Sequence, residues 1–239
     1  MRAVLAQTRA ELTLTLRRGE SVLLSLGIPV LLLIFFSTVD VGFLRSPRVD
    51  FLAPGVLSLA VRSTARVGLG LATGFERQYG VLKRLGSTPL GRPGLLAAKT
   101  AAILAVEALQ AVVLVAVALI LGWHSHGSAA LAAGAMALAT VAFAGLGLLM
   151  AGTLRGEGVL AAANGLYLVL LLLGGMVVPL GRLPAGVRAG ARLLPAAALS
   201  DALHGAFSRQ ATAPARPWVV LVAWAVLAPT VAALTFRWE

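Results

Sequence analysis

The sequence predicts an all-helical membrane protein with six transmembrane helices in a single domain, residues 1–239. Hydrophobic residues make up 59% of the chain and charged residues 12%, whereas a soluble domain would carry about 25% charged residues. The mean hydropathy is high, at +0.93. Six apolar runs with short connections occupy most of the sequence, which leaves no room for a separate soluble domain between them.

Each apolar run is long enough to cross a bilayer, which takes about 20 helical residues. Two connections are too long for simple turns, the polar segment 74–99 and the mixed segment 181–217. The predicted spans are residues 22–39, 51–73, 101–121, 129–154, 159–180 and 218–236.

Residues 1–20 precede the first span and are polar but patterned. A helix here has an apolar face, with its arginines elsewhere. This pattern predicts an amphipathic helix that lies in the membrane interface. Its apolar face comprises Leu5, Thr8, Leu12 and Leu16.

Six spans place both termini on one side of the membrane. With the termini inside, the inner segments hold eleven Arg and Lys residues and the outer segments seven. Basic residues favour the cytoplasmic side. We therefore expect both termini and the segment 74–99 in the cytoplasm. These flanking residues, which also contact anionic lipid headgroups, account for the net charge of +11 without nucleic acid.

The segment 74–99 is a basic island between two apolar runs. Read as a helix, it has one apolar stripe and one charged stripe. Gly91, Pro93 and Gly94 are expected to keep the chain irregular before the third span. A short amphipathic helix at the membrane surface suits the docking of a soluble partner. The alternative is that the basic residues only set the orientation of the chain in the membrane. It explains the positive charge of the segment but not the helical spacing of its apolar and charged residues. The apolar stripe comprises Phe75, Tyr79, Leu82 and Leu85, and the charged stripe Glu76, Gly80 and Lys83 with Arg77 and Arg84 beside it.

The segment 181–217 is too apolar for a free loop and too broken to form a span. Leucines and valines alternate in it with Arg188, Arg192 and Asp201. Two short helices that dip into the outer leaflet fit this pattern.

Two motifs resemble one known family. The run E-R-x-x-G-V-L-K-R-L-x-x-T-P-L, from Glu76 to Leu90, resembles the first cytoplasmic loop of ABC-2 type transporter permeases. These are the membrane subunits of ATP-driven exporters, including daunorubicin-resistance permeases. The segment between the family's last two spans is similar to Val178-Pro179-Leu180, Leu183-Pro184, Leu194-Pro195 and Asp201-Ala202-Leu203. Together with the span spacing, the resemblance covers nearly the whole chain.

The resemblance implies an exporter of drugs, antibiotics or lipid-like molecules in a bacterial cytoplasmic membrane. It implies a second permease, identical or homologous, and two ABC ATPase chains that bind ATP and Mg²⁺. It also implies re-entrant helices as an outer gate, around Pro179, Pro184 and Pro195. The residues that would dock in the ATPase, as a coupling helix, are Glu76, Arg77, Gly80, Lys83, Arg84, Thr88 and Pro89.

No nucleotide site is predicted in this chain. The nearest approach to a phosphate-binding loop runs from Gly94 to Thr100, but it lacks the glycine before Lys99 and leads into a span. The chain is therefore expected to be a transport subunit without its own enzyme activity or cofactor.

Three charged residues lie inside predicted spans: Arg62, Arg66 and Glu107. Arg66 and Glu107 lie at similar depths, about 10 Å from the cytoplasmic ends of their spans at 1.5 Å per residue, which predicts an ion pair. Each arginine costs about 2.5–3.5 kcal/mol near a helix centre on insertion scales, so both should face protein or water. The simpler interpretation is structural pairing or snorkelling. The alternative is that Arg62 lines the substrate path and favours anionic or amphiphilic molecules.

Other functions are less well supported. His124, His126, His204 and Asp201 form too weak a pattern for a metal site, and Ser200 with Asp201 and His204 lacks a hydrolase motif. A channel or an ion-driven secondary transporter would need coupling carboxylates or an inverted repeat. Glu107 is the one acidic residue within the predicted spans.

Overall fold

The structure is a computed structural model of the chain. It describes residues 2–17, 19–39, 48–64, 73–76, 79, 91–124, 127–154, 156–175, 180–208, 211 and 213–235. This part of the chain forms ten helices and no strand, as the composition predicts.

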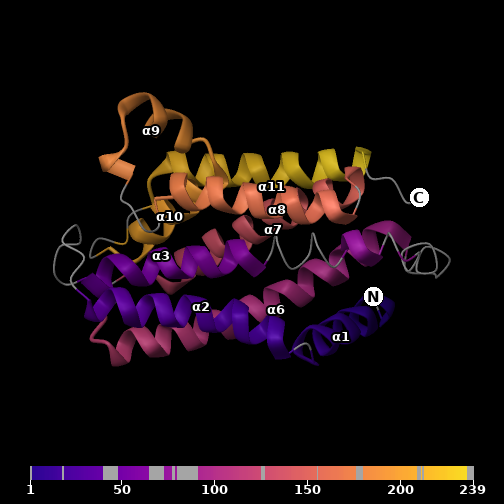
Figure 1. Ribbon diagram of the computed structural model, residues 1–239, viewed down its shortest axis with the longest axis horizontal. Coiled ribbons are helices and arrows are strands. Elements are labelled where there is room, and N and C mark those ends of the chain that lie inside the picture. Colours follow the sequence, from indigo (N-terminus) through magenta and orange to yellow (C-terminus); the bar gives the residue numbers. More distant parts are fainter. Residues whose placement is uncertain are drawn as a thin grey trace.

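Six long helices run side by side along one axis (Figure 1). Each overlaps one predicted span. They are α2 (Gly19–Thr38), α3 (Arg48–Arg62), α6 (Gly91–Ile120), α7 (Ala129–Thr153), α8 (Gly156–Leu173) and α11 (Ala215–Thr235).

Three of the described helical stretches are long and apolar enough to cross a membrane: Ala97–Ile120, Ala129–Thr153 and Ala215–Thr235. Two shorter apolar stretches, Ser25–Thr38 and Gly158–Leu173, belong to α2 and α8. The described part of α3 has 15 residues, and the rest of its predicted span lies outside the described residues. The total of six spans therefore stays a prediction.

Two helix ends differ from the predicted pattern. The prediction of an irregular chain around Gly91, Pro93 and Gly94 is wrong, because α6 begins at Gly91. A proline in the first turn has no intrahelical hydrogen bond to lose, so it does not prevent the helix from starting there. The second difference is the end of α8, which lies seven residues before the predicted end of the fifth span. Gly175 follows this helix with a φ of 68°.

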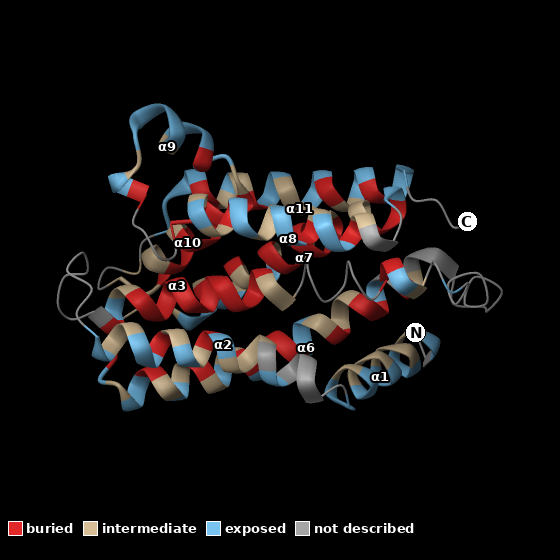
Figure 2. Cartoon of the chain, in the orientation of Figure 1, coloured by how far each residue is buried: buried red, intermediate tan, exposed pale blue. Residues whose placement is uncertain are grey.

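Helices α3 and α7 form the centre of the bundle (Figure 2). All residues from Leu52 to Arg62 of α3 are buried. The small residues of α7 allow α11 to approach closely: a Cβ added at Gly145 would lie 2.5 Å from the backbone N of Pro229. The close contacts expected from the Ala- and Gly-rich run are thus present.

The segment before α11 contains η2 (Leu180–Arg182), α9 (Ala185–Ala191) and α10 (Pro195–Ala206). Helix α10 packs against α3, α7 and α11, and its first six residues are all buried. Helix α9 projects from the side of the bundle (Figure 1). The two short helices predicted here are present, and their position in the outer leaflet stays a prediction.

The N-terminal helix α1 (Arg2–Arg17) packs against α6. Of the predicted apolar face, Leu5 and Leu16 are exposed, whereas Thr8 and Leu12 lie with Glu11 on the partly buried face. The position of α1 in the membrane interface stays a prediction. The start of α1 and the end of α11 lie at the same end of the molecule (Figure 1). This arrangement agrees with an even number of spans.

Candidate functional site

Three separate elements meet at Lys99, on the third turn of α6. Its Nζ lies 2.9 Å from Glu11 Oε1 on α1 and 2.8 Å from Glu76 Oε2. The side chain of Lys99 is only 2% exposed. An ammonium group so deeply buried needs charged partners to offset its lost hydration. We call Lys99, Glu11 and Glu76 the Lys99 cluster.

The surroundings of the Lys99 cluster hold its carboxylates in place. Gln7 Nε2 donates a hydrogen bond of 2.9 Å to Glu11 Oε1, one turn along α1. Lys99 Nζ also donates to Glu76 Oε1 at 2.9 Å, so both oxygens of that carboxylate face the ammonium group. The cluster therefore ties α1 and the residue-76 segment to the start of α6.

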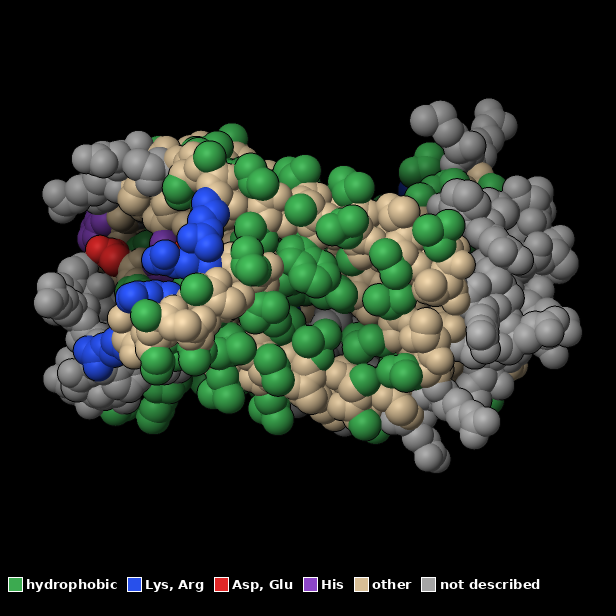
Figure 3. Space-filling view, turned by 90° about the horizontal axis from the view of Figure 1, so that it is seen from above, with side chains coloured by type: hydrophobic (Ala, Val, Ile, Leu, Met, Phe, Trp, Pro, Cys, Tyr) green, Lys and Arg blue, Asp and Glu red, His purple; other side chains and the backbone are tan. Residues whose placement is uncertain are grey.

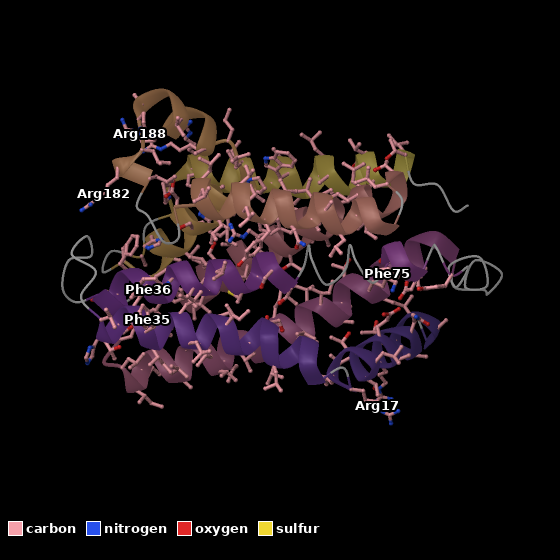
Figure 4. The ribbon with its side chains drawn as sticks, viewed as in Figure 1. Arg17, Phe35, Phe36, Phe75, Arg182 and Arg188 are labelled. Atoms are coloured by element: carbon pink, nitrogen blue, oxygen red, sulfur yellow. The ribbon has the colours of Figure 1, made fainter. Side chains whose placement is uncertain are left out.

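Residues 73–76 form one helical turn beside this cluster. Gly74 is buried against α8, where an added Cβ would lie 3.3 Å from Val159 Cγ2. Phe75 and Tyr79 are 40% and 73% exposed, and their rings stack with centroids 6.3 Å apart. Figure 4 shows Phe75 at the end of the molecule opposite Arg182 and Arg188. Two members of the predicted apolar stripe thus lie on the surface.

Of the predicted coupling residues, Glu76 is described, and it points inward to Lys99 rather than outward to a partner. The others lie outside the described residues, so the coupling helix itself stays a prediction. They are Arg77, Gly80, Lys83, Arg84, Thr88 and Pro89.

Arg62, which the sequence places within the second predicted span, is fully buried at the end of α3. Its Cζ lies 5.2 Å from the ring centroid of Tyr167 on α8, which is a cation–π contact. Its Nη1 would lie 3.2 Å from a Cβ added at Gly174. This enclosed position favours the structural interpretation of Arg62 over a place in the substrate path.

The predicted ion pair between Arg66 and Glu107 cannot be followed, because Arg66 lies outside the described residues. Glu107 is buried in α6 and accepts a hydrogen bond at Oε2 from Thr140 Oγ1 of α7. Among the described residues, its Oε1 has no hydrogen-bond partner.

One turn further along α6, Gln110 links this helix to α2 and to Thr64, two residues after α3. Its Oε1 accepts a hydrogen bond of 2.9 Å from Thr64, after α3, and its Nε2 donates at 3.1 Å to Ser25 of α2. Gln110 and its partners were not among the residues predicted from the sequence. The spacing of three residues between Glu107 and Gln110 in an apolar run was the available signal.

At the opposite end, the arrangement of Ser200, Asp201 and His204 does not resemble a hydrolase. Ser200 Oγ donates to Gly175 O at 3.3 Å. The two ring nitrogens of His204 lie 2.7 Å from Ser200 O and 3.0 Å from Phe51 O, whereas Ser200 Oγ is 3.5 Å from Nδ1, so backbone carbonyls are the nearer partners of both nitrogens. Burial raises the pKa of Asp201, and His204, Arg192 and Arg216 oppose that rise.

The described residues contain no group of three or more His, Cys, Asp and Glu side chains that could hold a metal ion. His126, a member of the rejected metal pattern, lies outside them. Of the predicted gate prolines, Pro184 precedes α9 and Pro195 begins α10, whereas Pro179 lies outside the described residues.

Comparison with known families agrees with this architecture. The sequence pattern of the ABC-2 type transporter matches residues 2–208, from α1 through α10. The chain belongs to the ABC-2 type transporter family. No curated protein shows a significant match to it.

Membership of the ABC-2 family identifies the chain as a multi-pass membrane permease component. The ABC-2 membrane domain lacks a nucleotide-binding domain, and ABC-2 permeases work with an ABC ATPase. The expectation of a transport subunit without its own nucleotide site is therefore confirmed. Lys99, the lysine nearest to a phosphate-loop pattern, is instead enclosed by two carboxylates.

Proposed function

We propose that this ABC-2 permease exports drug-like, antibiotic or lipid-like molecules across the bacterial cytoplasmic membrane. A separate ABC ATPase, which binds ATP and Mg²⁺, would supply the energy. A second permease copy or homologue would complete the path between the two membrane domains. Both termini and the segment 74–99 would lie in the cytoplasm, as the distribution of basic residues favours.

The observation that carries the proposal is the Lys99 cluster. ATP-driven closure of the ATPases would push on the segment that begins at Gly74. Because Glu76 is bound to Lys99, that displacement would reach α6 directly and α1 through Glu11. A rigid connection of this kind can convert a local movement into a tilt of whole helices.

The exposed pair Phe75 and Tyr79 supports the same interpretation. Both side chains lie close to the Lys99 cluster and offer apolar surface to a partner. We expect them to contact the ATPase together with Lys83 and Arg84. Glu76 would not touch the ATPase, and would instead connect this surface to Lys99 of α6.

Reconstitution tests the proposal against the alternative of a secondary transporter or channel. Proteoliposomes would contain the full-length permease alone or with the ATPase that co-purifies with it. The probes would be a fluorescent amphiphilic dye and a fluorescent phospholipid analogue. We expect movement of at least one probe only with the ATPase, ATP and Mg²⁺. Transport by the permease alone on a proton or sodium gradient would contradict the proposal.

A further inference from the structure

A short basic hairpin extends from the bundle beside α11. It comprises residues 180–194, with η2, α9 and the turn that follows, and we call it the basic hairpin. Arg182 and Arg192 are exposed and Arg188 is partly exposed. Val187 and Leu193 are also exposed, at 44% and 60%. Figure 3 shows basic and hydrophobic side chains together at this end of the molecule.

Specific contacts hold the basic hairpin against the bundle. Arg188 Nη1 donates a hydrogen bond of 3.5 Å to Gly181 O, which links its two arms. Ala191 is buried with Leu180 and Ala197 in a small apolar cluster. The indole Nε1 of Trp224 donates to Leu193 O at 2.9 Å. The hairpin is therefore an ordered element with a defined outer surface.

The contact with Trp224 also fixes the position of the hairpin along the axis of α11. Trp224 lies nine residues after the start of α11, which is about 14 Å along a helix. The turn at Leu193 thus lies beside α11 and not beyond its end. A membrane-spanning α11 of 21 residues is about 32 Å long, so this level lies among the acyl chains, near the middle of the helix. Arg182 and Arg188 lie nearer the end of the molecule (Figure 4).

The basic hairpin is rich in positive charge. The sequence has three arginines in this segment and no acidic residue between Glu157 and Asp201. The Asp201 carboxylate interacts with Arg192 and with Arg216 of α11. Arginines next to exposed aliphatic side chains are typical of an interfacial element, and a guanidinium group binds phosphate oxygens in a bidentate manner.

We propose that the basic hairpin binds the phosphate groups of anionic phospholipids through Arg182 and Arg188, with Val187 and Leu193 in the acyl region. The assignment to the outer leaflet rests on the orientation in the proposed function, whereas lipid binding itself does not. Because the hairpin continues directly into α10, bound lipid would hold the start of α10 at a fixed depth.

A label at residue 187 tests the proposal locally. The chain has no cysteine, so Val187→Cys can carry a single nitroxide in the full-length permease. Nanodiscs would contain phosphatidylcholine alone or mixed with phosphatidylglycerol. We expect phosphatidylglycerol to raise the accessibility of the label to oxygen relative to a water-soluble nickel chelate. Arg182→Gln with Arg188→Gln should abolish that difference, and Arg182→Lys with Arg188→Lys should preserve most of it. Arg192 is left intact because it interacts with Asp201.

The matched control removes two exposed arginines from α1, by Arg9→Gln with Arg17→Gln, and should leave the label at residue 187 unchanged. Native mass spectrometry gives a second measurement. Retention of phosphatidylglycerol should be about thirtyfold weaker in the hairpin variant, from the usual contribution of two basic residues near an anionic surface. Retention of phosphatidylcholine should not change.

Three results would overturn the proposal. The first is equal accessibility of the label in both lipid mixtures. The second is a hairpin glutamine variant that still shows the difference in accessibility between the mixtures. The third is loss of that difference on addition of millimolar glycerol phosphate, which would indicate a site for soluble anions. None of these measurements uses ATP or transport. A failure of the exporter proposal would therefore leave their outcome unaffected.

Discussion

Lys99 shows how one residue can connect elements that are far apart in the sequence. Its ammonium group is nearly inaccessible to water, and both of its carboxylate partners come from other elements. The buried lysine is stable only while both partners stay in place, so the cluster is sensitive to any change in one member.

Replacement of Lys99 should destabilise the permease. Lys99→Met removes the shared ammonium group from between the carboxylates of Glu11 and Glu76, and we expect a loss of about 3 kcal/mol in the free energy of unfolding. Thermal unfolding in detergent measures this loss. Lys99→Arg should retain most of the stability, and the triple variant K99M/E11Q/E76Q should recover much of it. A Lys99→Met variant as stable as the parent would contradict the assigned role.

Asp201 lies on α10, outside the predicted spans, and gives the fold a dependence on pH. Burial raises the pKa of its carboxyl in the folded state. The folded protein therefore binds this proton more tightly than the unfolded chain does. The resulting stabilisation is present below the ordinary carboxyl pKa and is lost as the pH rises through the raised value.

We expect Asp201→Asn to reduce the loss of stability that accompanies the rise in pH through the raised pKa of this carboxyl. The unfolding temperature of the parent should fall between about pH 4 and neutral pH by more than that of the variant. The variant should also be the more stable of the two at neutral pH, because an amide avoids the cost of burying a charge. Unfolding scans across this pH range provide the measurement, and parallel profiles would show that Asp201 is not the group responsible.

At the scale of helices, the contact between α7 and α11 depends on the absence of a side chain at one position. A Cβ at Gly145 would lie 2.5 Å from Pro229 N and 2.8 Å from Ala228 C, both in the backbone of α11. Backbone atoms cannot rotate away as a flexible side chain can. The two helices would have to separate.

Gly145→Ala should therefore destabilise the bundle by about 1–3 kcal/mol, the usual cost of overpacking. Gly165→Ala is the matched control, because a Cβ at Gly165 on α8 meets no atom within 4 Å. That substitution should be neutral or slightly stabilising, since alanine favours helix more than glycine does. Unfolding temperatures of the two variants would be compared in the same detergent. Equal destabilisation would show that helix separation is not the cause.

For the whole molecule, the main feature is the separation of its two polar ends. Phe75 and the Lys99 cluster lie at one end, and Arg182 and Arg188 of the basic hairpin lie at the other (Figure 4). Long apolar helices connect the two. A movement at the first end can reach the second only by displacing these helices.

Charge reversal in the segment proposed to contact the ATPase should impair coupling to the ATPase without impairing membrane insertion. Lys83→Glu with Arg84→Glu should leave membrane insertion normal, because most other basic residues on the proposed cytoplasmic side remain. Association with the ATPase and ATP-dependent transport should both fall by more than tenfold, as expected when several charged contacts at an interface are reversed. Co-purification and transport assays measure the two effects. Intact association with the ATPase would contradict the docking role.

The sequence by itself was sufficient for the helical class, for the six apolar runs and for the two short helices between α8 and α11. These features depend on local composition and on periods that repeat within a few residues. It was also sufficient to place Phe75 and Tyr79 on one apolar stripe, because residues four apart share a helix face. The exposure of both side chains is known only from the structure. The start of α6 was misjudged, because Gly91, Pro93 and Gly94 break a helix interior but are tolerated in a first turn.

Only the tertiary structure decided which polar groups meet. The partners of Lys99 lie 23 and 88 positions away along the chain. Glu107 meets Thr140, and Arg62 meets Tyr167, across helices whose rotation no local pattern specifies. Spans of similar hydrophobicity can pack at many rotations with comparable burial, so the pairing of their few polar side chains depends on the packing of small residues throughout the bundle.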